Sequence, residues 1–154
     1  MKGRPDATAE TSFAGGVTFR YIETSALLAA RIENDPVASA AVRGEGRRFL
    51  SALTIGEAAR RLIRAGVLQQ LSSNQVRAAL LWLGRFERRC HTLDITPAIL
   101  ARVRRPFPIE PVRTLDAIHL ATIESIEEAP STVAVVTRDR RIAENARAMG
   151  DFVE

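Results

Sequence analysis

Cysteine is nearly absent from this sequence of 154 residues: Cys90 is the only one. The chain can therefore form no internal disulfide and no zinc site built from cysteines. Tryptophan and tyrosine occur once each, which argues against an aromatic platform for single-stranded bases. No apolar run is long enough to span a membrane, and residues 1–16 lack the apolar core of a signal peptide. We therefore expect a cytoplasmic protein.

Lysine is equally scarce, because Lys2 stands alone among the 22 basic residues and the rest are arginines. The net charge is +4. The arginine side chain offers a rigid fork of donors that suits phosphate, and a basic surface favours a polyanionic partner. Arginines that merely keep helix faces solvated would give the same composition. Composition alone leaves both interpretations open.

Strand-like and helix-like segments alternate along the chain. Strands are predicted at 17–22, 47–52, 91–96 and 133–137, with a further candidate in the last four residues. Helices are predicted at 24–34, 37–46, 53–66, 72–90, from Pro97 onward, at 114–126 and at 138–150. This order predicts an α/β fold, a three-layer α/β/α sandwich with a mostly parallel central sheet. We expect one domain over residues 19–154, preceded by a flexible extension over residues 1–18.

The segment TLDAIHLAT, residues 114–122, places a carboxylate and an imidazole one turn apart in an apolar helix. A buried carboxylate such as that of Asp116 needs a partner, because burial without one costs several kcal/mol or forces the group to keep its proton. His119 lies at i+3 and could be that partner in a purely structural pair. The alternative is that Asp116 belongs to a group of acids gathered around a cation.

Three further acids lie where a parallel sheet binds its ligands, beyond the carboxyl ends of the strands or in the first turn of a helix. Glu23 follows the first predicted strand, Asp139 follows the strand at 133–137, and Glu57 lies early in the helix at 53–66. Each also has a structural explanation: Glu23 and Asp139 could cap helices, and Glu57 could close a capping box with Thr54. If the acids converge, their oxygen ligands suit Mg²⁺ or Mn²⁺.

Four segments, in this order, resemble PIN-domain proteins of the VapC toxin type: YIETSALLAA (21–30), LTIGEAARRL (53–62), TLDAIHLAT (114–122) and VVTRDRRIAENARAMG (135–150). The likeness runs from about residue 19 to the C-terminus, and the last two segments are the most specific. The family pattern places four acids at the end of the first strand, in the third helix, in an LDAxHLA helix and after a VVTxD strand. The matching positions are Glu23, Glu57, Asp116 and Asp139.

The resemblance implies a metal-dependent endoribonuclease, paired with an antitoxin protein and forming a homodimer. The four acids would hold one or two Mg²⁺ or Mn²⁺ ions, and a metal-bound water would attack the RNA phosphate. Thr24, Ser25 and Thr137 lie beside the acids and could supply hydroxyls that orient them. His119 would be a packing and hydrogen-bonding residue rather than a ligand. The arginines that could guide an RNA backbone are Arg43, Arg47, Arg48, Arg60, Arg61, Arg64, Arg102, Arg104 and Arg105.

One position departs from the family pattern: the first acid is Glu23, where the family typically has aspartate, as in YLDTSAL. The extra methylene moves the carboxylate by more than an ångström, and Mg²⁺ demands near-ideal octahedral geometry. An alternative is therefore a catalytically weakened module that binds RNA or an antitoxin without turnover. A third interpretation gives the arginines no role beyond keeping a dimeric scaffold soluble.

Overall fold

The computed structural model describes residues 19–44, 46–126 and 133–154. Its centre is one sheet of five parallel strands in the order β3-β2-β1-β4-β5. The strands are β1 (Phe19–Ile22), β2 (Arg47–Ser51), β3 (His91–Leu93), β4 (Val133–Val136) and β5 (Phe152–Val153). The predicted parallel sheet is confirmed, whereas the predicted extension over residues 1–18 lies outside the described residues.

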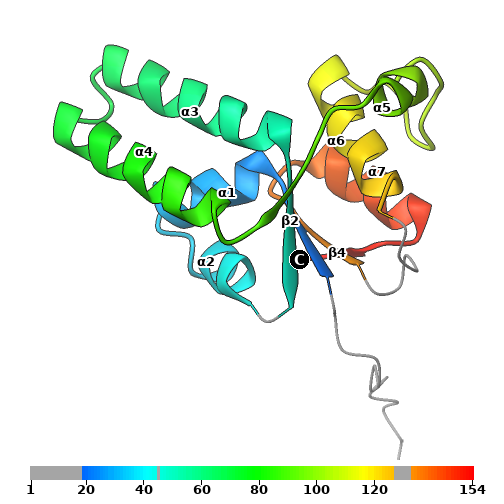
Figure 1. Cartoon of the computed structure of the whole chain (residues 1–154), viewed down its shortest axis with the longest axis horizontal. Coiled ribbons are helices and arrows are strands. Elements are labelled where there is room, and N and C mark those ends of the chain that lie inside the picture. Colours follow the sequence, from blue (N-terminus) through cyan, green and yellow to red (C-terminus); the bar gives the residue numbers. More distant parts are fainter. Residues whose placement is uncertain (1–18, 45, 127–132) are drawn as a thin grey trace, which may run out of the picture.

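Seven helices of the described ranges cover the two faces of this sheet. They are α1 (Thr24–Arg31), α2 (Pro36–Arg43), α3 (Ala52–Val67), α4 (Ser73–Glu87), α5 (Pro97–Arg102), α6 (Thr114–Glu124) and α7 (Arg140–Met149). Figure 1 shows α1 to α4 on one side of the strands and α5 to α7 on the other. The predicted three-layer α/β/α class is therefore confirmed. None of these helices is long and apolar enough to span a membrane.

The two central strands fill both layers of core. Successive side chains of a strand point to opposite faces, so Tyr21 packs with α6 and α7 while Ile22 packs with α1, α3 and α4. All four residues of β4 are buried, as expected of a parallel strand covered on both faces. Packing on both faces therefore fixes where the last residues of β1 and β4 lie, and so fixes where the loops that follow them begin.

Most predicted elements are present with shifted ends. The first helix stops at Arg31, and Asp35 then caps α2 by accepting hydrogen bonds from the N–H groups of Val37 and Ala38, both at 2.9 Å. Pro36 therefore begins a helix as well as following one, a position that its fixed φ favours. The third helix starts at Ala52, one residue before the predicted start and directly after β2.

Candidate active site

Glu23 follows β1 directly and caps α1 with its side chain. It is 4 % exposed. Its Oε2 accepts hydrogen bonds from the Ser25 N–H at 3.0 Å, from the Thr137 hydroxyl at 2.8 Å and from the Ser25 hydroxyl. Its Oε1 has no hydrogen-bond partner in the described chain and lies 4.0 Å from Nε2 of His119. One oxygen therefore holds the carboxylate in place while the other stays free.

Glu57 points into the same region from α3. Its Oε2 accepts hydrogen bonds from the Thr24 hydroxyl at 2.7 Å and from Nε2 of His119 at 2.8 Å. Burial acts to raise the pKa of Glu57, but the hydrogen bonds from His119 and Thr24 outweigh it and hold this pKa below its usual value. Glu57 is therefore ionised at neutral pH.

The predicted capping box between Thr54 and Glu57 is wrong. The cap of α3 is Ser51, whose side chain accepts a hydrogen bond from the N–H of Leu53 at 3.1 Å. Because the helix begins earlier than the sequence pattern indicates, Thr54 lies inside the helix, and its buried hydroxyl forms no hydrogen bond with Glu57. The Glu57 carboxylate is therefore available to the site.

His119 is the centre of a buried hydrogen-bonded chain. It is 1 % exposed, and its Nδ1 lies 2.6 Å from the Tyr21 hydroxyl. An ionised Glu57 can only accept a hydrogen bond, so Nε2 of His119 carries a proton, and in the neutral imidazole Nδ1 is then the acceptor that faces Tyr21. Burial, followed by the charge of Glu23, raises the pKa of Tyr21 well above its usual value, so its hydroxyl keeps the proton that it donates. In this tautomer Nε2 has no lone pair free for a metal.

Asp116 lies in the first turn of α6 and is half-buried rather than fully buried. The alternative of a purely structural pair with His119 is wrong, because the imidazole bonds to Tyr21 and Glu57 instead. No residue in the described ranges donates a hydrogen bond to the Asp116 carboxylate. The pKa of Asp116 is raised, mainly by partial burial and next by the negative charge of Asp139. The charge of Glu23 adds a smaller effect in the same direction. The nearby positive charge of Arg113 offsets this rise only in part.

Asp139 lies beyond the end of β4 and caps α7. Its Oδ1 accepts hydrogen bonds from the N–H groups of Arg141 at 2.8 Å and Ile142 at 3.1 Å. Its own N–H donates to the Thr137 hydroxyl at 3.0 Å, and that hydroxyl donates in turn to Glu23. The capping role foreseen from the sequence is confirmed, and it occupies only one of the two carboxylate oxygens.

The structure thus brings the four predicted acids to one edge of the sheet. Oxygens of Glu23 and Glu57 and a ring nitrogen of His119 all lie within 4.8 Å of one another; because Nε2 is protonated, the two carboxylates are the groups of this cluster that could bind a metal ion. Asp116 is close enough to Asp139 and Glu23 to sense their charges. Carboxylate oxygens without partners, crowded by other carboxylates, fit a hard divalent cation that would neutralise them.

Sequence reasoning missed one participant, Tyr21. A lone tyrosine within a predicted strand indicates a core residue, and Tyr21 is indeed 0 % exposed. Only its place two residues before Glu23 connects it with the site, and that spacing carries no chemical signal on its own. The three hydroxyl residues beside the acids, Thr24, Ser25 and Thr137, were foreseen, and each forms a hydrogen bond with Glu23 or Glu57.

Comparisons with known proteins agree with this geometry. Residues 20–148 match the PIN domain family. The chain is 36% identical to Ribonuclease VapC35 of Mycobacterium tuberculosis, in two strains, over 133 residues that make up 84% of this chain and 90% of the relative. The crystal structure of PAE2754 from Pyrobaculum aerophilum superposes with a TM-score of 0.60 and 22% identity, covering 96% of this chain and 92% of the other, and this likeness concerns the fold alone.

The fold and its acidic edge define a PIN domain. The chain belongs to the PIN-domain family and, within it, to the VapC proteins.

Proposed function

We propose that this protein is a divalent-metal-dependent endoribonuclease and the toxin of a toxin–antitoxin pair. The observation that carries the proposal is the meeting, at the carboxyl edge of a parallel sheet, of four acids from distant parts of the chain. RNA as the substrate is supported by the similarity to a protein named as a ribonuclease. Residues 19–154 would form a single catalytic domain.

Glu23, Glu57, Asp116 and Asp139 would hold Mg²⁺ or Mn²⁺. Carboxylate oxygens are the ligands that these hard cations prefer. When bound, such a cation supplies an activated water and stabilises the charge that develops on the phosphodiester. The donor set contains no thiolate, so it does not favour soft metals.

The surrounding side chains position the acids before any substrate arrives. Ser25 and Thr137 hold Glu23 through one oxygen, while Thr24 and His119 hold Glu57. A carboxylate held in this way loses little conformational freedom when it binds an ion. Asp116 is the exception, because its unpartnered charge becomes favourable only when a cation offsets the repulsion from Asp139 and Glu23.

An antitoxin and a second copy of the chain are the proposed protein partners, and the proposed location is the cytoplasm. Apolar side chains at the end of α3 support a protein interface: Ile63, Val67 and Leu68 are 38%, 77% and 52% exposed. These side chains line one hollow together with Arg60, Arg61 and Arg64, and exposed apolar side chains that are grouped often mark a contact with another chain.

The proposal is tested by incubating purified protein with single-stranded RNA. We expect cleavage in the presence of Mg²⁺ or Mn²⁺ and none in excess EDTA, because the acids cannot activate water without the cation. Mapping of the cut ends and restoration of activity by added Mn²⁺ complete the measurement. Cleavage that persists in EDTA at an unchanged rate would contradict the proposal.

A Glu23→Asp variant separates the nuclease from a catalytically weakened binding module. We expect the change to lower the cleavage rate about tenfold, because the shorter side chain cannot both keep the hydrogen bonds to Ser25 and Thr137 and present its second oxygen to a cation. The rate constant at saturating Mn²⁺ is the measurement. An inert native protein that this substitution activates would instead support the weakened module.

A further inference from the structure

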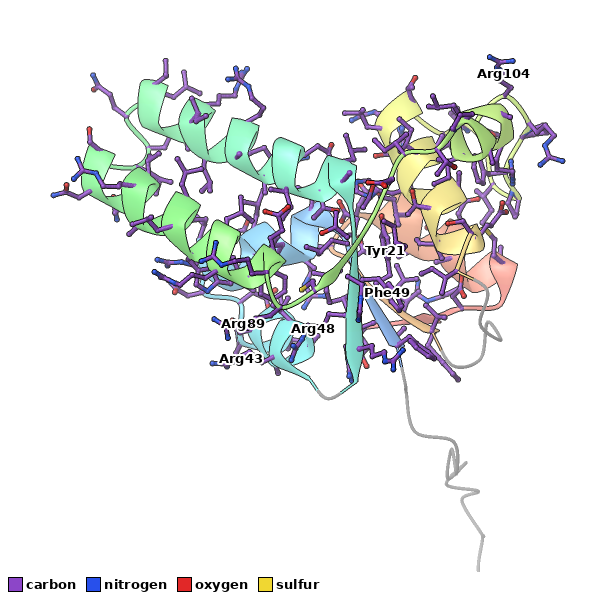
Figure 2. All side chains as sticks on the ribbon, in the orientation of Figure 1. Tyr21, Arg43, Arg48, Phe49, Arg89 and Arg104 are labelled. Atoms are coloured by element: carbon purple, nitrogen blue, oxygen red, sulfur yellow. The ribbon has the colours of Figure 1, made fainter. Side chains whose placement is uncertain are left out.

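A cavity with a volume of about 230 Å³ lies away from the acids, among α1, α2, β2 and α4. Four of its lining residues are arginines: Arg31, Arg43, Arg48 and Arg89. Figure 2 shows Arg43, Arg48 and Arg89 grouped beside α2, on the face of the sheet opposite α5 to α7. None of the four acids of the candidate active site lines this cavity.

The positive charge of this arginine pocket is not neutralised. No acid is among its lining residues, and within the described ranges none of its four arginines takes part in a salt bridge. Other arginines of the chain do pair with acids, such as Arg102 with Glu124 and Arg138 with Asp35. Crowded guanidinium groups repel one another unless an anion lies between them.

The four side chains differ in how firmly they are held. Arg48 is fixed, because it donates to the carbonyl oxygens of Val42, Arg43 and Gly44 at the end of α2. Arg43 uses only its Nε, which donates to the carbonyl oxygen of Ser39 at 3.2 Å. The Arg89 guanidinium group has no hydrogen-bond partner in the described chain. A guanidinium group that is held in place, beside others whose N–H groups remain free, suits the binding of an anion.

Arg31 adds an orphaned donor. Its Nε is buried and without a hydrogen-bond partner in the part of the chain that the structure describes. Its guanidinium carbon lies 5.9 Å from the ring centroid of Trp82, which itself stacks on Phe86 at 5.3 Å between centroids and 16° between planes. A buried unpaired donor is costly, and the aromatic wall lowers the local dielectric and so strengthens attraction to an anion.

We propose that this arginine pocket binds a phosphate group, either free or as part of an RNA backbone. Phosphate suits the pocket better than a carboxylate, because its several oxygens can accept from guanidinium groups that approach from different helices. The RNA form of the proposal rests on the proposed nuclease function, whereas the free-phosphate form does not. In either form the phosphate binds outside the acid cluster and without a metal.

Trp82 is the only tryptophan of the chain, so its fluorescence reports directly on this pocket. The full chain, in EDTA to exclude metal-mediated binding, is titrated with inorganic pyrophosphate and separately with an oligouridylate of about eight nucleotides, within the usual length of single-strand sites. We expect a saturable change of Trp82 emission with at least one of these ligands, weakened by salt as a charge interaction requires.

Two double variants provide the test of location. Arg43→Gln with Arg89→Gln removes two charges from the pocket, and we expect it to weaken binding at least about tenfold. Arg140→Gln with Arg147→Gln removes the same charge from α7, which Figure 1 shows on the other side of the sheet, and we expect binding of pyrophosphate within about twofold of native. Circular dichroism verifies that both variants are folded.

A third variant, Arg31→Lys, keeps the pocket charge but removes the planar fork, and we expect it to weaken binding as well. Binding of pyrophosphate identifies a free-phosphate site, and binding of the oligouridylate alone identifies an RNA-backbone site; both support the proposal. It is overturned if neither ligand binds, if both double variants lose binding equally, or if a hexaglutamate peptide binds more tightly than both phosphate ligands. None of these binding measurements requires RNA cleavage, so they can be interpreted even if the protein has no nuclease activity.

Discussion

An Asp116→Asn variant will lose RNA cleavage by at least about 10³-fold, which corresponds to about 4 kcal/mol of transition-state stabilisation. Asparagine has nearly the same shape, so the loss comes from the charge. The Asp116 carboxylate has no hydrogen-bond partner in the described chain, and its pKa is raised by partial burial and by the charges of Asp139 and Glu23. A cation is the partner that such a group lacks.

The stability of the same variant distinguishes a lost site from a damaged fold. A carboxyl group whose pKa is raised in the folded protein makes a contribution to stability that is fully present below its unfolded pKa. This contribution is lost as the pH rises through the folded pKa. At neutral pH the charged Asp116 is therefore unfavourable. We expect Asp116→Asn without metal to unfold at the same temperature as native protein or at a higher one.

Thermal unfolding with and without Mn²⁺ completes this experiment. Native protein should gain stability from Mn²⁺, since a ligand that binds only the folded state stabilises it by mass action, and the variant should gain much less. Asp94→Asn is the matched control, because Asp94 is exposed, follows β3 and forms no hydrogen bond with the four acids in the described chain. Native cleavage rates in Asp116→Asn would overturn the assignment of this residue.

Replacing His119 by leucine will weaken Mn²⁺ binding about 10- to 100-fold and lower the free energy of unfolding by about 2–3 kcal/mol. The imidazole donates to Glu57 at 2.8 Å and accepts from Tyr21 at 2.6 Å. Leucine fills similar space, but it leaves the buried Tyr21 hydroxyl and a carboxylate oxygen of Glu57 without the imidazole as their hydrogen-bond partner. Glu57 would then be held by Thr24 alone. Isothermal titration with Mn²⁺ and chemical denaturation measure the two effects.

A His119→Gln variant distinguishes a positioning residue from a metal ligand. The glutamine amide can donate to Glu57 and accept from Tyr21, so we expect it to restore most of the Mn²⁺ affinity that leucine loses. If Nε2 bound the metal directly, glutamine would lose as much affinity as leucine. Equal losses in both variants, with stability preserved in both, would therefore contradict the positioning role.

The layered fold was predictable because its signals are local. Alternating strand and helix patterns and the apolar run of β4 require no knowledge of distant contacts, and the parallel sheet follows from them. Helix ends were less predictable. Ser51, the last residue of β2, also caps α3. The strand and the helix therefore share a boundary that neither the strand pattern nor the helix pattern of apolar residues reveals.

Within the candidate site, the side chains were predictable but their partners were not. The sequence pattern suggests that Asp116 pairs with His119, because the two lie one helical turn apart. In the structure the imidazole instead reaches Tyr21 on β1 and Glu57 on α3. Such contacts depend on how α6 packs against the sheet, which spacing along one helix cannot encode. The arginine pocket was equally hidden, since its side chains come from four separate elements.

The position of β4 beside β1 has a consequence for incomplete chains. Ile22 is paired with Val136, and Thr137, one residue later, ties Glu23 to the backbone of Asp139. A polypeptide that ends before β4 still contains Glu23, Glu57 and Asp116, but it lacks the neighbour strand, the threonine and the fourth acid. The cluster of carboxylates therefore becomes complete only after synthesis has passed β4 and Asp139.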